Sequence, residues 1–162
     1  MLNSAPGGRW GMHVKDPSHP LTFREVPYNS PDYLELARLR DLHLRQPIGL
    51  RLRDSDRAGE EQHRHFLLED EGVILGGLIA VPLGGESAKL RQMWIHPDHR
   101  GSGHGQRLLE EVEQKLISEG VRHFTLHARM NAKAFYAKCG YEEIGESFME
   151  VGRPHVRMDR YV

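Results

Sequence analysis

Apolar and polar side chains alternate in short runs along much of this chain, and apolar repeats at helical spacing separate some of these runs. Alternation predicts half-buried strands, whereas a repeat of about 3.6 residues predicts a helix with one apolar face. The predicted strands cover residues 21–27, 65–69, 73–81, 88–96, 121–128, 141–151 and 155–161. The predicted helices cover residues 31–46, 103–120 and 131–139, and the polar stretch 54–62 is a short helix or a loop.

Turn and capping residues mark several of these boundaries. Ser30 and Pro31 are typical of a helix start, because the serine hydroxyl accepts a first-turn hydrogen bond and proline needs no partner there. Pro47 ends this helix, since proline cannot donate the next backbone hydrogen bond. The sequence Asp-Glu-Gly at residues 70–72 predicts a tight hairpin between two strands.

The order of the predicted elements indicates one mixed α/β domain. Residues 88–128 form a strand, a helix and a second strand, which predicts a parallel pair joined by a right-handed crossover. Residues 1–20 are rich in Gly, Pro, His and Ser and show no hydrophobic period, so we expect them to form a flexible N-terminal arm.

Composition excludes several classes of protein. The chain of 162 residues has a single cysteine, Cys139, so an internally disulfide-bonded secreted scaffold is excluded. The formal net charge is −1, so we expect no whole-chain attraction to nucleic acid or to an anionic membrane. No apolar run approaches the roughly 20 residues that span a bilayer, and the first residues lack the apolar stretch of a signal peptide. We therefore expect a cytoplasmic protein that binds anionic ligands through a local feature.

The most informative segment is a glycine-rich turn between the strand over residues 88–96 and the helix after it. It consists of Arg100, Gly101, Ser102, Gly103, His104 and Gly105. Alternate glycines remove side chains where backbone approaches a ligand, and the helix start offers unpaired N–H groups and a positive dipole end. The segment therefore predicts a phosphate or pyrophosphate site, although the same glycines also suit a plain tight turn.

Two known phosphate-binding turns do not fit this segment. A P-loop requires Gly-Lys-Ser/Thr at its end, but Gln106 follows Gly105. A dinucleotide-binding turn requires G-x-G-x-x-G and an acidic residue at a strand end about 20 residues later. Here the spacing is G-x-G-x-G, and Glu119 falls at a helix end. A nucleotide-dependent oxidoreductase is therefore disfavoured.

Two motifs together resemble the GNAT superfamily of N-acetyltransferases. Arg100, Gly103 and Gly105 follow a strand that ends in Trp-Ile-His-Pro, and they are similar to the family's acyl-CoA-binding motif, Q/R-x-x-G-x-G/A. Matches to a second family motif, over residues 131–141, are Asn131, Ala132, Ala134, Phe135, Tyr136, Gly140 and Tyr141.

The resemblance implies a GNAT acetyltransferase domain of the small bacterial type over residues 21–162. Its expected fold is α/β, of the α+β type. A mixed, mostly antiparallel sheet of six to seven strands would contain a splayed parallel central pair, with about four helices.

The same resemblance implies how acetyl-CoA, the acyl donor, is held. The backbone of Met93, Trp94 and Ile95 would pair with the pantetheine arm and direct an N–H at the thioester carbonyl. The turn over residues 100–105 would bind the pyrophosphate. Asn131 would contact the pantetheine, and Lys133 or Lys138 would meet a phosphate.

Catalytic roles also follow from the resemblance. Tyr136 occupies the family's general-acid position. Its phenol, with a pKa of about 10, stays protonated at neutral pH and can protonate a thiolate, whose thiol has a pKa of about 8.5. The alternative is that Tyr136 only packs beside Phe135 on a short helix. Glu150 and His155 are the candidates for the general base, although either can instead be a structural hydrogen-bonding group.

The histidines and arginines raise further questions. Eleven histidines suggest a metal, but paired Cys/His spacing and HExxH are missing from the sequence, so we expect no metal. Five arginines lie between residues 37 and 54: Arg38, Arg40, Arg45, Arg51 and Arg53. Interleaved leucines predict a solvated helix face, and an alternative hypothesis is that Arg45 and Arg51 face an acidic part of the acceptor. Arg129 stands where a subset of the family often has glutamine.

The sequence thus predicts an N-acetyltransferase that moves the acetyl group of acetyl-CoA to a primary amine of a small molecule or peptide. The transfer would occur by direct attack in a ternary complex. A non-catalytic acyl-CoA sensor or regulatory module on the same fold is the alternative, and the presence of Tyr136 argues against it. The expected partner is a small-molecule amine, with no nucleic acid and no membrane, and a homodimer is left open.

Overall fold

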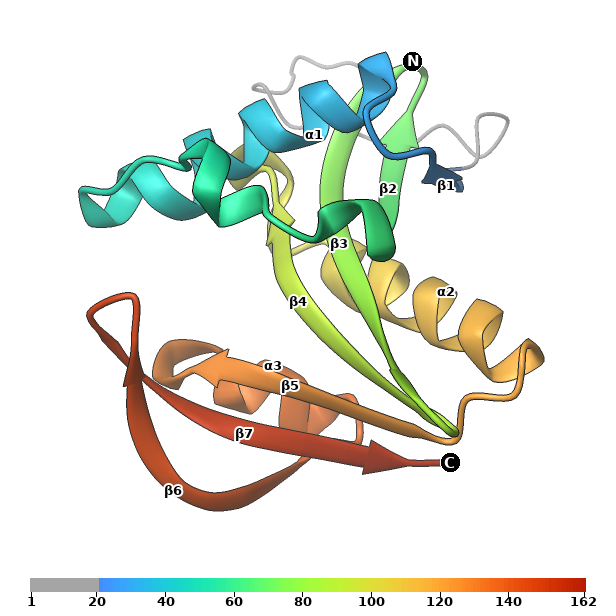
Figure 1. Cartoon of the computed structure of the whole chain (residues 1–162), viewed down its shortest axis with the longest axis vertical. Helices are drawn as coiled ribbons and strands as arrows, with labels where there is room; N and C mark the ends of the chain where they lie inside the picture. The colour runs from blue at the N-terminus through green and yellow to red at the C-terminus, as the bar shows by residue number, and fades with distance from the viewer. Residues whose placement is uncertain (1–20) are drawn as a thin grey trace, which may run out of the picture.

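A computed structural model describes residues 21–162 of the chain (Figure 1), and the arm predicted over residues 1–20 lies outside the described residues. Seven strands form one sheet in the order β1-β2-β3-β4-β5-β7-β6. The strands are β1 Thr22–Val26, β2 Arg64–Asp70, β3 Val73–Gly84, β4 Ser87–Ile95, β5 His123–Arg129, β6 Glu142–Glu150 and β7 Arg153–Tyr161. Strands β4 and β5 pair in parallel, whereas the other neighbours pair in antiparallel fashion. The predicted mixed sheet with a parallel central pair is confirmed.

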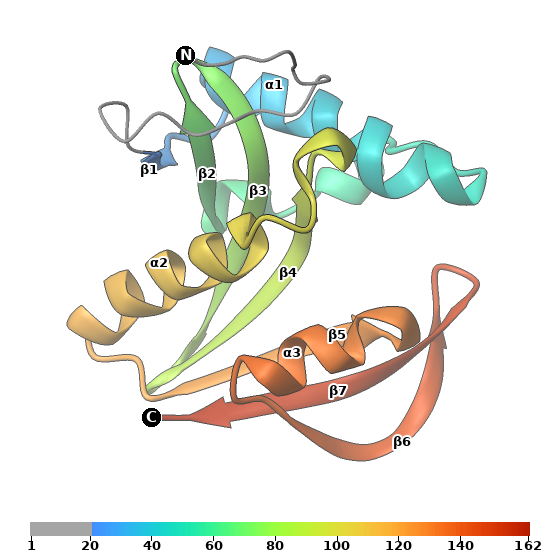
Figure 2. The ribbon, with the colours of Figure 1, turned by 180° about the vertical axis from the view of Figure 1, so that it is seen from behind.

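Helices cover both faces of this sheet. Helix α1 (Pro31–Arg40) continues as the π-helical segment η2 (Asp41–Arg45) on the face toward the viewer in Figure 1. Helices α2 (His104–Ser118) and α3 (Lys133–Lys138) cover the opposite face, which is turned toward the viewer in Figure 2. Among residues 21–162 these are the four helical segments of five residues or more, as predicted.

Short 3-10 segments complete the chain between these elements. They are η3 Gln46–Ile48, η4 Asp54–Arg57, η5 Glu60–Gln62, η6 Pro97–His99 and η7 Met130–Ala132. The predicted helix over residues 31–46 therefore has the right extent but changes type after Arg40. Its start is as predicted, since the Ser30 side chain accepts a hydrogen bond from the Tyr33 N–H.

Two apolar cores lie on the two faces of the sheet. Leu108, Leu109 and Val112 of α2 are fully buried against the sheet on one face. On the other face, Tyr33 of α1 packs with Trp94 of β4. Burying each of the larger side chains contributes about 1.5–3 kcal/mol, so these two cores fix α1 and α2 relative to the strands between them.

A bulge in β4 determines which face its last residues reach. The β3–β4 register places Gln92 and Met93 opposite one residue, Leu78, and Gln92 has a φ of +56°. Because an extra residue reverses the alternation, Leu90 lies in the α2 core, whereas Trp94 turns to the α1 core.

After Leu90, just before the bulge, β4 and β5 diverge, as both views of the ribbon show (Figures 1 and 2). Their pairing joins Ser87–Leu90 to His123–Leu126 and then stops, although β4 continues to Ile95 and β5 to Arg129. Strand β4 instead follows β3, where Gly76 permits a close approach. A Cβ on Gly76 would lie 2.6 Å from the Trp94 carbonyl oxygen. The backbone of residues 93–95 is therefore no longer paired with β5.

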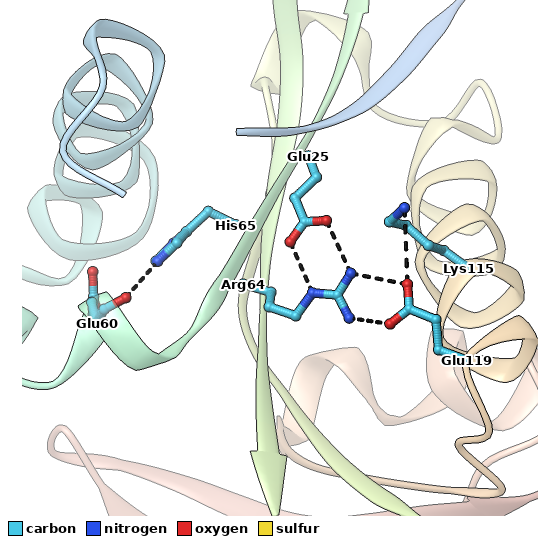
Figure 3. Close-up of polar contacts among 6 residues, drawn as sticks. All are labelled: Glu25, Glu60, Arg64, His65, Lys115 and Glu119. Atoms are coloured by element: carbon cyan, nitrogen blue, oxygen red, sulfur yellow. Dashed lines mark hydrogen bonds and ion pairs between the residues drawn. The ribbon is translucent and has the colours of Figure 1, made fainter. Parts of the chain in front are cut away.

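Two neighbouring residues of β2 tie its two faces to surrounding elements (Figure 3). Arg64 donates to Glu25 of β1 at 2.8 and 2.9 Å and also to Glu119 at the end of α2. His65 points to the other face, where its Nε2 lies 2.9 Å from the Glu60 carbonyl oxygen. Strand β2 is thereby linked to α2 on one side and to η5 on the other.

Candidate active site

The glycine turn leads from β4 into α2 through two glycines in left-handed conformation. Gly101 has a φ of +81°, and Gly103, the N-cap of α2, has a φ of +84°. Within residues 21–162, a Cβ at either position would meet nothing within 4 Å, so conformation rather than crowding favours glycine here. The first N–H groups of a helix lack partners inside it, and the exposed turn can present these donors to an anion.

Gly105 serves a different purpose, which is close packing. A Cβ on Gly105 would lie 3.3 Å from Phe135 Cζ and 3.4 Å from Met93 Cε. The missing side chain lets the first turn of α2 rest against α3 and β4. The turn is thereby fixed beside Met93, in the stretch of β4 that has left β5.

Tyr136 of α3 reaches the same stretch of β4. Its hydroxyl donates to Met93 Sδ at 3.7 Å, and thioether sulfur is a weak acceptor. Burial raises the pKa of Tyr136 to about 12, with a further rise from the Cys139 thiol and an opposing effect of the Arg129 charge. The phenol is therefore protonated at neutral pH and keeps a hydroxyl proton available beside β4. Tyr136 also packs against the α2 core, so the two alternatives for this residue are structurally compatible.

The other predicted acetyl-CoA-binding residues are placed as follows. Arg100 Nε donates to the Ile95 carbonyl at 3.0 Å and so attaches the turn to the end of β4. Ser102 is exposed in the turn, and Asn131 is exposed in η7. Lys133 begins α3, and its Nζ lies 3.2 Å from Glu143 of β6, so a carboxylate already neutralises that charge.

Glu150 and His155 come together across the β6–β7 hairpin, and His127 of β5 joins them. Glu150 Oε1 lies 2.8 Å from His127 Nδ1, and Glu150 Oε2 lies 4.0 Å from His155 Nε2. Burial acts to raise the pKa of Glu150, but the His127 hydrogen bond and the charges of His127 and His155 lower it overall.

The tautomer of His155 follows from its surroundings. His155 is buried, and its Nδ1 lies 2.8 Å from the Arg153 carbonyl oxygen. Because a carbonyl only accepts, Nδ1 carries a proton, and Nε2 is the ring nitrogen that faces Glu150. The sequence did not single out His127, although it shares a strand face with Arg129, which pairs with His155 across β5 and β7.

Tyr136 and the Glu150–His155 pair lie on different elements. Tyr136 lies against β4 in the α2 core, whereas the pair lies on the β6–β7 hairpin. Arg129 is adjacent to His155 in the β5–β7 register, and its charge lowers the pKa of Tyr136.

The predicted solvated face of the arginines between residues 37 and 54 is wrong for Arg40. Arg40 is buried, and its guanidinium lies 3.0 Å from a carboxylate oxygen of Glu60. Arg51, a candidate for acceptor binding, is exposed, and its Nε lies 3.2 Å from Asp41. The leucine pattern did not reveal these partners, because Glu60 approaches only after the chain folds back.

Histidine rings line the path from η2 to the glycine turn. His43 and His96 have centroids 4.9 Å apart, and His96 and His99 follow at 5.3 Å. His104 continues the row at 6.4 Å from His99. In the described part of the chain, these histidines and the acidic residues form no group of three or more ligands suited to a metal ion. None of the helices described in residues 21–162 has the length and apolar character needed to cross a membrane.

Comparison with known proteins agrees with this architecture. Residues 52–162 match the family model described as an acetyltransferase (GNAT) domain. A putative acetyltransferase of Bacillus subtilis is 32% identical over 97 residues, which are 60% of this chain and 65% of that protein.

Two solved structures share the fold at low sequence identity. A putative N-acetyltransferase from Lactobacillus plantarum has a TM-score of 0.77 at 22% identity, covering 87% of this chain and 97% of that one. A GNAT family acetyltransferase from Elizabethkingia anophelis with acetyl-CoA bound has a TM-score of 0.68 at 14% identity, covering 88% and 98%. Since the family model matches well over half of the chain, this protein belongs to the GNAT family of acetyltransferases.

Proposed function

We propose that this protein transfers the acetyl group of acetyl-CoA to a primary amine of a small molecule or a peptide in the cytoplasm. The observation that carries the proposal is the divergence of β4 from β5 beside both the glycine turn and the Tyr136 hydroxyl. At this point a thioester, a phosphate-binding turn and a proton donor can serve one reaction.

Acetyl-CoA would be held mainly by backbone groups. Met93, Trp94 and Ile95 lie in the part of β4 that β5 has left, so their backbone can pair with the pantetheine amides. The turn from Arg100 to Gly105 would bind the pyrophosphate through N–H groups, and Asn131 and Lys133 would add contacts. When bound, the thioester supplies the activated acetyl group.

Direct transfer requires one base and one acid from the protein. The amine nitrogen attacks the thioester carbonyl carbon, the C–S bond breaks, and the amine loses a proton. His155 Nε2, or Glu150 beside it, would take that proton, and the Tyr136 hydroxyl would protonate the leaving thiolate sulfur. His155→Ala should remove the acid limb of the pH–rate profile if His155 is the base, and an unchanged limb would exclude it.

The test is thiol release from acetyl-CoA with amino acids, polyamines, amino sugars and short peptides as acceptors. Turnover with at least one amine supports the proposal. Acetyl-CoA binding without turnover on any amine would instead indicate a non-catalytic acyl-CoA sensor. Calorimetry with acetyl-CoA, run on the same preparation, separates these two outcomes from simple failure to bind.

A further inference from the structure

We propose that Arg129, with Arg45 and Arg153, forms a subsite for the carboxylate of the acceptor, so that the preferred acceptor is an amine that also carries a carboxylate. This inference rests on the proposed transfer to an amine and names the class of its acceptor.

The position of Arg129 places it at the proposed reaction centre. It is the last residue of β5, at the end that diverges from β4, and its Cα pairs with that of His155. Its Nη2 donates to the Leu44 carbonyl at 3.1 Å, which attaches β5 to η2. The next residue of η2 is Arg45, and Arg153 begins β7 two residues before His155.

These three arginines lack acidic partners, a property that they share with Arg91, Arg100 and Arg122 but not with the other arginines of the described residues. Within residues 21–162, no carboxylate lies within ion-pair distance of Arg129, Arg45 or Arg153. The arginines that form an ion pair with an aspartate or a glutamate are Arg24, Arg38, Arg40, Arg51, Arg53, Arg57, Arg64, Arg107, Arg157 and Arg160. Asp56 is influenced by the Arg45 charge, but its carboxylate accepts from the Arg53 backbone N–H.

The like charges around Arg129 are unfavourable without an anion. Arg129 is half-buried, and burial lowers its pKa, followed by the charges of Arg45 and Arg153. The only hydrogen bond of its side chain among the described residues uses one of five guanidinium donors. A carboxylate can accept two of the remaining donors in parallel, the geometry that arginine matches best.

The charge next to this subsite explains why an amine should sit beside the carboxylate. In the β6–β7 register Glu150 pairs with Arg153, as Arg129 pairs with His155 across β5 and β7. Glu150 and His155 can attract and deprotonate an ammonium group, although the positive charges of Lys89 and His127, which lower the pKa of Glu150, partly offset its negative charge. Adjacent positive and negative groups thus complement an amine and a carboxylate a few bonds apart, as in an amino acid. None of the three arginines belongs to the glycine turn, which would bind the phosphates, so the proposed carboxylate subsite is separate from the proposed phosphate site.

The experiment compares free amino acids with their C-terminal amides as acceptors in the thiol-release assay. Both members of a pair have the same side chain, and their rates are compared at equal concentrations of the unprotonated amine, because amidation lowers the pKa of the α-amine. We expect kcat/KM for the amino acid to exceed that for the amide by about 10- to 100-fold, the range of a charge-assisted hydrogen bond. Equal rates, or faster amides, would overturn the carboxylate subsite and leave the proposed acetyl transfer intact.

Single substitutions test whether Arg129 and Arg153 bind the carboxylate of the acceptor. Arg129→Gln should raise KM for the amino acid by about 10- to 100-fold while changing KM for acetyl-CoA and for the amide little. The matched control is Arg122→Gln, which replaces an exposed arginine near the other end of β5 that donates to backbone carbonyls. Should Arg129→Gln fail to fold, Arg153→Gln, at an exposed position, gives the same comparison. Unchanged amino-acid KM in the folded variants would overturn the assignment.

Binding of the acceptor is measured separately from turnover, so that a missing carboxylate subsite can be distinguished from a missing acetyltransferase activity. Calorimetry titrates the same amino acids and amides into the protein with coenzyme A present. Preferential binding of the carboxylate form that Arg129→Gln abolishes and Arg122→Gln retains supports the subsite even if no amine is acetylated. Equal or absent binding of both forms by a protein without turnover would overturn the subsite together with the proposed function.

Discussion

Arg40, the last residue of α1, and Arg129, the last residue of β5, are both withdrawn from solvent, but their surroundings differ in charge. The Arg40 guanidinium lies 3.0 Å from Glu60, and the same carboxylate accepts a hydrogen bond from Tyr33 Oη at 2.7 Å. Burial lowers the pKa of Arg129, and the charges of Arg45 and Arg153 lower it further.

This difference separates a charge used for folding from one available to a ligand. A charge removed from water is unfavourable unless an opposite charge and hydrogen bonds compensate it. Glu60 compensates Arg40 and so holds η5 against α1, with His65 on the Glu60 backbone carbonyl (Figure 3). In the described part of the chain Arg129 has no acid in that position, and a bound anion would supply it. Variants in the two regions should therefore differ in what they change: stability in one, turnover or acceptor affinity in the other.

Glu60→Ala should have the largest effect on folding. It leaves the Arg40 charge buried without its partner and also removes the acceptor of Tyr33. We expect the free energy of unfolding to fall by about 3–5 kcal/mol, measured by urea denaturation. Glu61→Ala, at the exposed neighbouring position, is the control and should change little. Similar midpoints for the two variants would show that Arg40 does not depend on Glu60.

Tyr136→Phe, in contrast to Glu60→Ala, should cause a large loss of turnover and little loss of stability. The change removes the proton donor beside β4 and only a weak hydrogen bond to sulfur. We expect kcat to fall by about 100-fold or more, within the range of general acid catalysis, with acetyl-CoA affinity nearly unchanged. Tyr161→Phe makes the same chemical change at an exposed site and serves as control. Wild-type turnover in Tyr136→Phe would exclude this tyrosine as the acid.

Asp159 lies on the same strand as Arg153, but its charge, unlike that of Arg153, is compensated by neighbouring groups. Burial acts to raise its pKa, but hydrogen bonds from Arg157, Thr125 and His123 lower the pKa to about 2 from the ordinary 3.8. Because the folded-state pKa is depressed, its contribution is present above about pH 4 and is lost as pH falls toward 2. The shift corresponds to about 2 kcal/mol.

Denaturation of Asp159→Asn as a function of pH checks this expectation. At pH 7 the variant should be less stable than the wild type by about 2 kcal/mol, and the difference should shrink between pH 4 and 2. Asp54→Asn, at a fully exposed carboxylate, provides the control. A constant difference across the acid range would mean that ionisation of Asp159 does not stabilise the fold.

The sequence predicted features that depend on neighbouring residues. The strand positions, the Ser30 cap and the glycine-rich start of α2 all follow from local patterns that the structure contains. The bulge at Gln92 and Met93 was not predicted, because plain alternation places Leu90 and Trp94 on one face.

Long-range pairing was harder to predict for a physical reason. Glu60 follows Arg40 by 20 positions, and Glu150 follows His127 by 23, so both contacts depend on how distant elements meet. Interleaved leucines suggested a solvated Arg40, and alternation gave no reason to select His127. The proposed roles of Tyr136, Glu150 and His155 came from the family resemblance and stay predictions.

Glu35→Gln should have the smallest effect and shows whether burial, rather than charge pairing alone, gives Glu60 its importance. Glu35 and Arg38 form an ion pair of the same type at 2.7 Å, but 43% of the Glu35 side chain and 62% of the Arg38 side chain are exposed. Water solvates both charges when the pair is broken, so we expect a loss of no more than about 0.5 kcal/mol in urea denaturation. A loss approaching that of Glu60→Ala would remove the distinction between buried and exposed arginines, and with it the reason to treat the uncompensated charge of Arg129 as unusual.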